Sequence, residues 1–150
     1  MTDDDDEFNR VGLDPLERLL VVATRHPLSA KNATLQQRAY YAELIVSDSS
    51  ARYTHQPKDS FMGSQNVVFL SDFQAKRTAL LLGAGYGWMP TPLIEAQLLE
   101  GTLQVLQGEP SRWTFAPQVV TRKSRPLGRA GQLFVDTLLL GSPALNNIQE

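Results

Sequence analysis

Cysteine is absent from this sequence of 150 residues. A disulfide framework and a thiolate metal site are therefore excluded, and a reducing compartment is permitted. Long apolar runs are lacking as well, and none approaches the roughly 20 residues that a membrane-spanning helix needs. An excess of charge of one sign is also missing, because the formal net charge is only −2. Direct binding of nucleic acid or of a membrane by this chain is not expected.

The remaining composition is that of an ordinary folded domain, with 42% hydrophobic and 20% charged residues. The start of the chain, Asp3 to Glu7, is acidic and polar, whereas a signal peptide begins with basic and then apolar residues. We expect residues 1–12 to form a flexible acidic N-terminus and residues 143–150 a flexible tail. Between them, residues 13–142 have the length of a single domain.

Predicted strands and helices alternate along the chain. Hydrophobic runs and turn residues predict strands over residues 16–24, 43–47, 66–70, 86–89, 102–106 and 115–122. Helices are predicted from Thr34 to about Tyr41, from Ser71 to Gly83, from Thr91-Pro92 to Gly101, and over residues 127–140. Residues 51–65 show no clear period. This alternation favours an α/β layered domain with a mostly parallel sheet.

Three of these helix starts are predicted to have side-chain caps. Thr34-Leu35-Gln36-Gln37 has the Thr-x-x-Gln spacing of a capping box. Ser71-Asp72-Phe73-Gln74 has the spacing of a capping box with Ser71 as the cap. Thr91-Pro92 places a threonine cap before a proline at the first helical position. The helix from Ser71 is predicted to carry Ala75, Ala79 and Leu82 on one face. On the helix from Thr91 the corresponding residues are Leu93, Ala96 and Leu99. On the helix over residues 127–140 they are Ala130, Phe134 and Leu138.

The segment Gly83-Ala84-Gly85-Tyr86-Gly87 contains three closely spaced glycines. A dinucleotide-binding loop needs a strand before its glycines and a helix after them. Here the predicted helix precedes and the strand follows. We interpret these glycines as a helix stop and as sites of close strand packing.

The run from Leu70 to Pro90 resembles the strand, helix and Gly-x-Gly-x-Gly-x-x-Pro segment of LysR-type effector-binding domains. Val21 to Ser29 is similar to the family's strand followed by His-Pro-Leu-Ala, and Leu98 to Leu103 resembles its Leu-x-x-Gly-x-Leu. These matches occur in the family's order and span about residues 19–140. The chain therefore resembles the second half of the effector (substrate)-binding domain of a LysR-type transcriptional regulator.

This resemblance implies an α/β fold of the periplasmic-binding-protein-like type 2 class, in which two lobes are joined by two crossovers. Residues 13–142 are expected to form a partial effector-binding domain. It would comprise mostly one lobe (regulatory subdomain II), crossovers near Leu20–Arg25 and Gln118–Arg122, and a C-terminal helix of the other lobe. The family's winged helix-turn-helix, and the first half of the domain before Leu13, are expected to be missing. The resemblance also implies a bacterial, cytoplasmic protein.

Two groups of polar residues are candidate ligand contacts. Ser71 and Asp72 open a predicted helix, whose first backbone N–H groups present a partly positive end to an anion. Ser47, Ser49 and Ser50 follow a predicted strand, and such hydroxyls suit a small polar or carboxylate ligand. The alternatives are a plain helix cap for the first group and an ordinary turn for the second.

No catalytic or metal-binding residues are predicted. The two histidines, His26 and His55, lack the spacing of metal ligands, and the Gly-x-Ser-x-Gly nucleophile motif is missing. Trp88 and Phe73 are interpreted as core residues, and the basic residues from Arg122 to Arg129 as a solvated approach to a helix. We expect no cofactor.

Three functions remain open. The first is the ligand-sensing part of a LysR-type regulator, with an organic anion as the favoured class of effector. The second is an interaction module that forms homo- or heterodimers with effector domains of intact regulators. The third is a truncated gene product without function. An enzyme is not expected, since an α/β architecture does not by itself imply chemistry.

Overall fold

A computed structural model describes residues 7–30, 32–47, 64 and 66–141. The chain divides into a larger unit, Glu17–Trp113, and a smaller unit, formed by Met1–Leu16 and Thr114–Glu150. The chain thus passes between the units at Leu16–Glu17 and again at Trp113–Thr114. The crossovers predicted near Leu20–Arg25 and Gln118–Arg122 were misplaced. Leu20 to Ala23 lie in the core of the larger unit, and residues 118–122 pair with a strand of the smaller unit.

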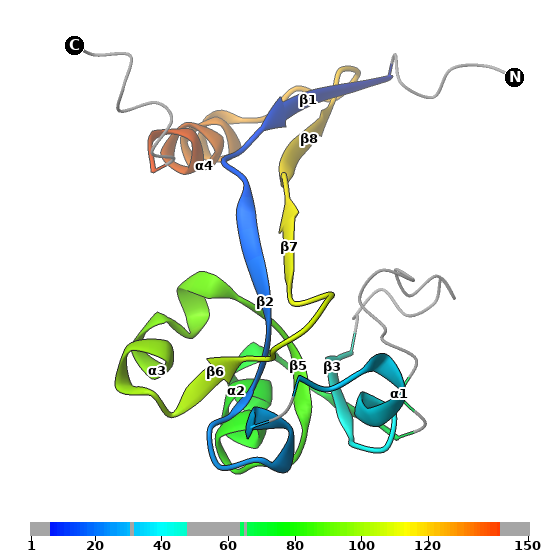
Figure 1. Cartoon of the computed structure of the whole chain (residues 1–150). Coiled ribbons are helices and arrows are strands. Elements are labelled where there is room, and N and C mark those ends of the chain that lie inside the picture. The colour runs from blue at the N-terminus through cyan, green and yellow to red at the C-terminus, as the bar shows by residue number, and fades with distance from the viewer. Residues whose placement is uncertain (1–6, 31, 48–63, 65, 142–150) are drawn as a thin grey trace, which may run out of the picture. The chain divides into compact units, whose positions relative to one another are not determined.

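The larger unit is built on a six-stranded sheet (Figure 1). Its strand order is β4-β3-β5-β2-β6, and β7 also pairs with β2. The strands are β2 (Leu16–Ala23), β3 (Glu43–Val46), β4 (Val67–Leu70), β5 (Tyr86–Pro90), β6 (Leu103–Val105) and β7 (Arg112–Phe115).

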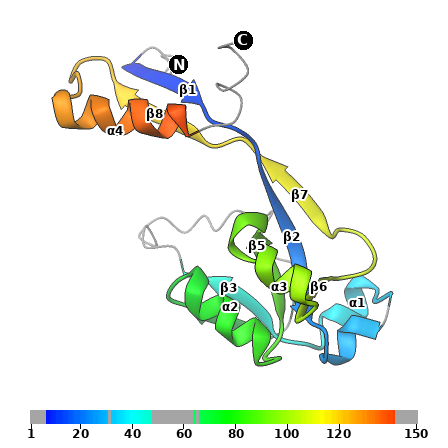
Figure 2. The same cartoon turned by 90° about the vertical axis from the view of Figure 1, so that its left-hand side faces the viewer.

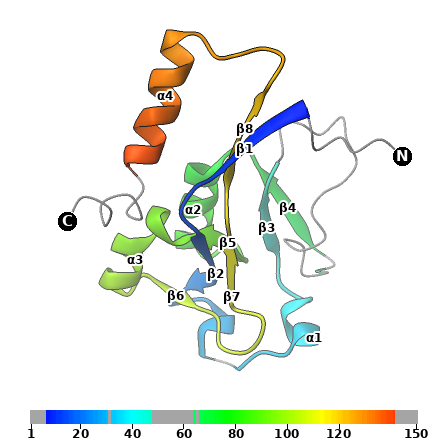
Figure 3. The ribbon, with the colours of Figure 1, turned by 90° about the horizontal axis from the view of Figure 1, so that it is seen from above.

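The sheet is mixed, so the prediction of a mostly parallel sheet was wrong. β3 runs parallel to β4 and β5, as Figure 3 shows for β3 and β4, whereas β2 is antiparallel to both β5 and β6. β2 and β5 are buried on both faces. A strand buried on both faces has a continuous apolar sequence whether its neighbours run parallel or antiparallel to it. Strand direction was therefore not readable from the hydrophobic pattern.

Helical segments cover both faces of this sheet. They are η2 (Pro27–Ala30), α1 (Leu35–Arg38), α2 (Phe73–Leu81), η4 (Thr91–Leu93) and α3 (Glu95–Glu100). On one face, Leu19 and Val21 pack with Leu80 of α2 and with Ile94 at the start of α3. α2 itself lies against β3, β4 and β5, and Figure 2 shows it beside β3. On the other face, residues near η2 and α1 pack against β2 and β5, and the cluster is Leu20, Val22, Leu28, Ala33, Tyr86, Trp88 and Leu106.

The predicted caps were correct at one helix and wrong at two. Thr34 and Gln37 form the predicted capping box of α1. The cap of α2 is Asp72 rather than Ser71, because the Ala75 N–H donates to Asp72 Oδ1 over 2.8 Å. The helix begins one residue later than predicted, with Phe73 at its first position, packed against the core. Thr91 opens a 3₁₀ turn and gives no side-chain cap, since its hydroxyl donates to the Glu17 carbonyl.

The buried faces of α2 and α3 also differ from the faces predicted from the sequence. α2 buries Lys76 and Leu80, whereas Leu82 is 70% exposed. Around α3, Ile94 is buried and Leu99 is 89% exposed. Both helix stops are as predicted, with Gly83 and Gly101 at φ of 78° and 74°, a region that glycine enters without strain. Gly85 is a site of close packing, because a Cβ there would collide with the Ala42 carbonyl oxygen.

The smaller unit contains β1 (Phe8–Gly12), β8 (Gln118–Arg122) and α4 (Arg129–Leu140). β1 and β8 pair antiparallel, so the second half of residues 1–12 forms a strand. The strand predicted over residues 115–122 is instead β7 and β8, separated at Ala116-Pro117, where the Pro117 carbonyl accepts the Leu13 N–H. α4 confirms the predicted C-terminal helix. Among the described residues, no helix has the length and apolarity that crossing a membrane requires.

Candidate functional site at the strand ends of the larger unit

The carboxyl ends of β3 and β4 bring two of the predicted ligand residues together. Val46 pairs with Leu70 at the last position of both strands, and the Ser47 N–H donates to the Leu70 carbonyl over 2.8 Å. Ser47 and Ser71 therefore follow neighbouring strands at one edge of the sheet. Both residues are exposed. The other two predicted contacts of this group, Ser49 and Ser50, lie outside the described residues.

Asp72 uses its carboxylate at the start of α2. Its Oδ1 accepts the Ala75 N–H, and the Ser71 hydroxyl lies 3.4 Å from Oδ2 and donates to it. The positive end of the helix is thus already balanced by a carboxylate of the chain. A second anion placed there would be repelled by Asp72. The hydroxyls of Ser47 and Ser71 remain the better contacts for an uncharged polar group.

A cavity of about 80 Å³ lies at the same edge of the sheet. Val46 and Phe73, which line it, directly precede Ser47 and directly follow Asp72. The full lining is Arg18, Ile45, Val46, Phe73, Lys76 and Trp88. Four elements, β2, β3, α2 and β5, therefore contribute to it.

Lys76 is the most unusual residue of this lining, because it is a lysine with only 4% of its surface exposed. Its side chain runs across Gly87 of β5, where a Cβ would lie 2.9 Å from Lys76 Cε and 3.2 Å from Nζ. Glycine at this position leaves the room that the ammonium occupies. Burial lowers the pKa of Lys76 to about 8; the carboxylate of Glu43 acts against this shift, and Arg18 adds to it.

The lining of the cavity also includes Arg18 and Trp88. Arg18 extends from β2, its guanidinium carbon is 5.3 Å from the centre of the Trp113 ring, and burial lowers its pKa. Trp88 is 5% exposed, and its buried Nε1 has no hydrogen-bond partner within the described part of the chain. A buried N–H without an acceptor is costly, so such groups are rare in folded proteins.

The sequence reading missed Arg18 and Lys76 and assigned Trp88 to the core only. A signal for Lys76 was present. Phe73, Lys76 and Leu80 are spaced i, i+3 and i+7, which places the lysine within the apolar stripe of α2. A cation at such a position is unusual enough to mark a site.

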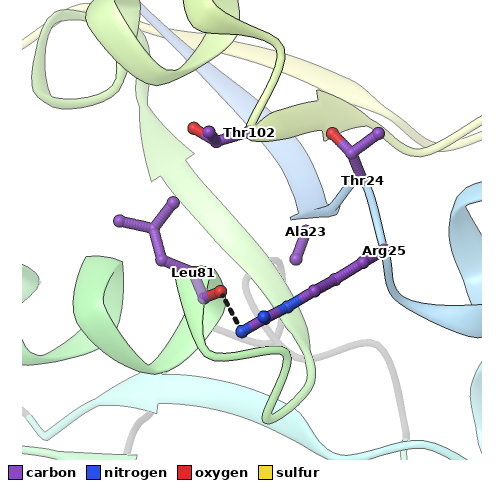
Figure 4. Close-up of a pocket in the computed structure, with 5 residues that line it drawn as sticks. All are labelled: Ala23, Thr24, Arg25, Leu81 and Thr102. Atoms are coloured by element: carbon purple, nitrogen blue, oxygen red, sulfur yellow. Dashed lines mark hydrogen bonds between the residues drawn. The ribbon is translucent and has the colours of Figure 1, made fainter.

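A second, larger cavity of about 320 Å³ lies near the other end of β2. Figure 4 shows its lining of Ala23, Thr24, Arg25, Leu81 and Thr102. The Arg25 side chain extends to Leu81 and donates from Nη2 to its carbonyl oxygen over 3.0 Å (Figure 4). Because this guanidinium already donates to a carbonyl of the last turn of α2, we interpret it as a helix cap and not as a ligand contact.

The histidine that the structure describes has a local structural role. His26 Nδ1 accepts the Leu28 N–H over 3.1 Å, and its ring packs edge-on against Tyr41. Burial lowers the pKa of His26. No group of three or more potential ligands is placed to hold a metal ion within the described ranges.

Comparison with known proteins identifies the family of this chain. The model of the LysR substrate-binding domain matches residues 2–140. The chain belongs to the LysR substrate-binding domain family. A curated relative of the chain is the probable HTH-type transcriptional regulator YhaJ of Escherichia coli K12, 31% identical over 105 residues. That match covers 69% of this chain and 35% of YhaJ, so the chain spans about a third of that relative's length.

Solved structures of LysR-type proteins share the fold of the chain. Full-length HypT of Salmonella typhimurium, described as a hypochlorite-specific LysR-type regulator, matches with a TM-score of 0.63 and 18% identity over 95% of this chain and 50% of HypT. The effector-binding domain of QuiR, solved with shikimate, matches with a TM-score of 0.57 and 20% identity over 95% of this chain and 68% of QuiR. The predicted α/β, periplasmic-binding-protein-like type 2 fold is confirmed.

Proposed function

We propose that this chain is the ligand-sensing part of a cytoplasmic LysR-type transcriptional regulator. A small-molecule effector binds at the strand-end edge of the larger unit and changes the geometry of attached DNA-binding domains. The observation that carries this proposal is the cavity beside Ser47 and Ser71, which Arg18, Lys76 and Trp88 help to line. Few polar groups in an otherwise apolar lining are typical of small-molecule sites.

The relatives support a sensory function over a catalytic one. YhaJ is described as a transcriptional regulator, and the QuiR domain as one in complex with shikimate. Shikimate is a carboxylic acid, which agrees with an organic anion as the favoured class of effector here. We propose that Ser47, Ser49, Ser50 and Ser71 contact such an effector, and that Asp72 orients the Ser71 hydroxyl. We propose no catalytic step and no cofactor.

A thermal-shift panel of organic acids, amino acids and sugars tests this function on the purified chain. An effector present at 100 times its Kd should raise the melting temperature by about 5 °C or more. The double variant Ser47→Ala/Ser71→Ala should lose most of this rise, whereas Ser124→Ala, a control in a turn of the smaller unit, should keep it. A panel in which no compound stabilises the wild-type chain contradicts a sensory function.

The apolar face of α4 supports pairing as a second function. Leu133, Phe134 and Leu140 are 65% to 70% exposed. Exposed apolar groups on one helix are a common mark of a protein interface. We propose a second copy of a LysR-type effector domain as the partner. Light scattering during size-exclusion chromatography should give the mass of a dimer, and a Phe134→Ser variant should elute as a monomer. A monomeric wild-type chain at high concentration contradicts pairing.

A further inference from the structure

Lys76 is a buried amine beside a cavity. Only 4% of its surface is exposed, and it lines the cavity of about 80 Å³ at the strand ends. Gly87 of β5 leaves the space that its Cε and Nζ occupy. Lysines are almost never buried in this way in folded proteins, because the ammonium loses its hydration. The burial of Lys76 therefore marks its amine as a candidate functional group.

Burial makes this amine a nucleophile near neutral pH. Only an unprotonated amine has the lone pair that attacks an electrophile, and a lysine with the ordinary pKa of 10.5 contains very little of that form. Burial lowers the pKa of Lys76 to about 8; Glu43 opposes this shift and Arg18 adds to it. Desolvation and a neighbouring cation are the two means by which proteins activate lysines that form imines with carbonyl compounds.

The charges around Lys76 favour one type of product. Glu43, 1% exposed, is the charged group that acts on Lys76 most strongly, and its carboxylate stabilises a cation. The nitrogen of an imine can carry a proton, so an imine can replace the ammonium near Glu43. A carbamate, formed from carbon dioxide, would place a second anion near this carboxylate and would be repelled. The surroundings therefore favour a carbonyl compound over carbon dioxide as the electrophile.

The cavity limits this carbonyl compound to a small one. A water molecule takes about 30 Å³ in the liquid, and a cavity of about 150 Å³ can hold benzene. At about 80 Å³ the cavity has room for a short aliphatic aldehyde but is small for an aromatic ring. Ile45, Val46 and Phe73 give it apolar walls, which suit a short alkyl chain.

We propose that the amine of Lys76 forms an imine with a short aliphatic aldehyde. The Nζ lone pair attacks the carbonyl carbon, a C–N bond forms, and the carbonyl oxygen leaves as water with both amine hydrogens. The reaction needs no oxidant or reductant. The inference goes beyond the proposed function, because it adds a covalent reaction at one residue of the same cavity.

The experiment labels the full chain with acetaldehyde at pH 7. Sodium cyanoborohydride, present throughout, reduces the imine to a stable ethylamine, and mass spectrometry of peptides gives the initial rate at each lysine. Lys123, an exposed lysine of the smaller unit, is the matched comparison. Lys76 should be labelled at least about tenfold faster than Lys123, because far more of its amine is unprotonated. Benzaldehyde, whose ring the cavity does not admit, should label Lys123 faster than Lys76.

Two further measurements assign the reactivity to the folded site. In guanidinium chloride, where the chain is unfolded, Lys76 and Lys123 should be labelled at equal rates. Arg18→Met removes the neighbouring cation and should slow the labelling of Lys76 at least about twofold. Arg25→Met, in the other cavity, should leave the rate unchanged. Thermal melts verify folding, and the comparison with the unfolded chain carries the test if Arg18→Met does not fold.

Equal rates at Lys76 and Lys123 in the folded chain would overturn the inference. An unchanged rate in a folded Arg18→Met variant, or benzaldehyde labelling of Lys76 as fast as that of Lys123, would do the same. A carbamate on Lys76, seen with ¹³C-labelled bicarbonate, would contradict the choice of electrophile. The proposed function fails separately. If Lys76 is labelled as expected and no compound of the thermal-shift panel stabilises the chain, the reactive amine stands and the sensory function does not.

Discussion

At the scale of single residues, the larger unit contains buried cations of two kinds. Arg38 is 1% exposed and donates to the carbonyl oxygens of Ala33, Gln107 and Pro110 over 2.9–3.1 Å. Its charge is satisfied by the backbone, which fixes α1 against the loop at residues 107–110. Lys76 instead lines a cavity. One buried cation is therefore held by backbone acceptors, and the other lines a cavity.

The first prediction concerns Arg38. Arg38→Met should lower the free energy of unfolding by about 3 kcal/mol, because three carbonyl oxygens lose a charged donor. The matched control is Arg112→Met. Its ion pair with Glu17 is 3.3 Å long, but the arginine side chain is 61% exposed, so the loss should stay below about 1 kcal/mol. Urea unfolding measures both values, and equal losses would contradict the assignment.

Lys76 predicts an unusual pH dependence of stability. Its folded pKa of about 8 lies below the ordinary 10.5. Between these values the unfolded chain holds more protons than the folded one, so stability rises with pH through this window. Burial raises the pKa of Tyr86 to about 12, which acts in the opposite direction between pH 10 and 12. The Lys76 effect is therefore best isolated between pH 8 and 10.

Wild-type stability should accordingly rise by about 2 kcal/mol more than that of Lys76→Met from pH 8 to pH 10. The groups facing Lys76 are Glu43 on β3 and Arg18 on β2, and both are common to the two proteins. Urea unfolding at pH 8, 9 and 10 gives the two slopes. Parallel slopes would mean that Lys76 keeps an ordinary pKa in the folded chain.

At the scale of elements, the start of α2 contains one residue that caps the helix, Asp72, and a neighbour that does not, Ser71. Asp72→Ala should lower the free energy of unfolding by about 1 kcal/mol, because the Ala75 N–H loses its acceptor. Ser71→Ala should change it by less than about 0.5 kcal/mol, since Ser71 lies outside the helix. Chemical denaturation of both variants measures the difference. A larger loss for Ser71→Ala would restore the capping box read from the sequence.

Local signals in the sequence predicted most elements. Thr34 with Gln37 marked α1, and Gly83 and Gly101 marked two helix ends, because caps and left-handed glycines act within a few residues. Strand direction was not predictable, since it depends on partners far apart in the chain. The rotation of α2 was missed for a related reason: Lys76 is buried only because Gly87 of β5 leaves space for it.

The candidate site was predictable only in part. The neighbouring strand ends that carry Ser47 and Ser71 followed from the order of the elements, whereas the cavity next to them did not. Arg18 of β2 and Trp88 of β5 are 70 positions apart in the sequence, and they line one cavity because β2 pairs with β5. A register of this kind has no local signature.

At the scale of the whole molecule, the two units should differ in stability. β2 and β5 are buried central strands of a six-stranded sheet, whereas β1 and β8 form a two-stranded one, which is marginal alone. Hydrogen exchange should therefore protect the amides of Leu20 to Val22 most and those of β1 least. Equal protection of both sheets would contradict this order. Substitutions in the smaller unit should then disturb ligand binding in the larger unit little.

The chain has the fold of the LysR substrate-binding domain family, and we propose the strand-end edge of the larger unit as its effector site. The most direct test of this account maps amide chemical shifts of the full chain with the strongest stabiliser from the thermal-shift panel. The account predicts that the largest changes cluster at Val46–Ser47, Ser71–Phe73 and Trp88. Changes that cluster around Arg25 and Thr102, or along α4, would contradict it.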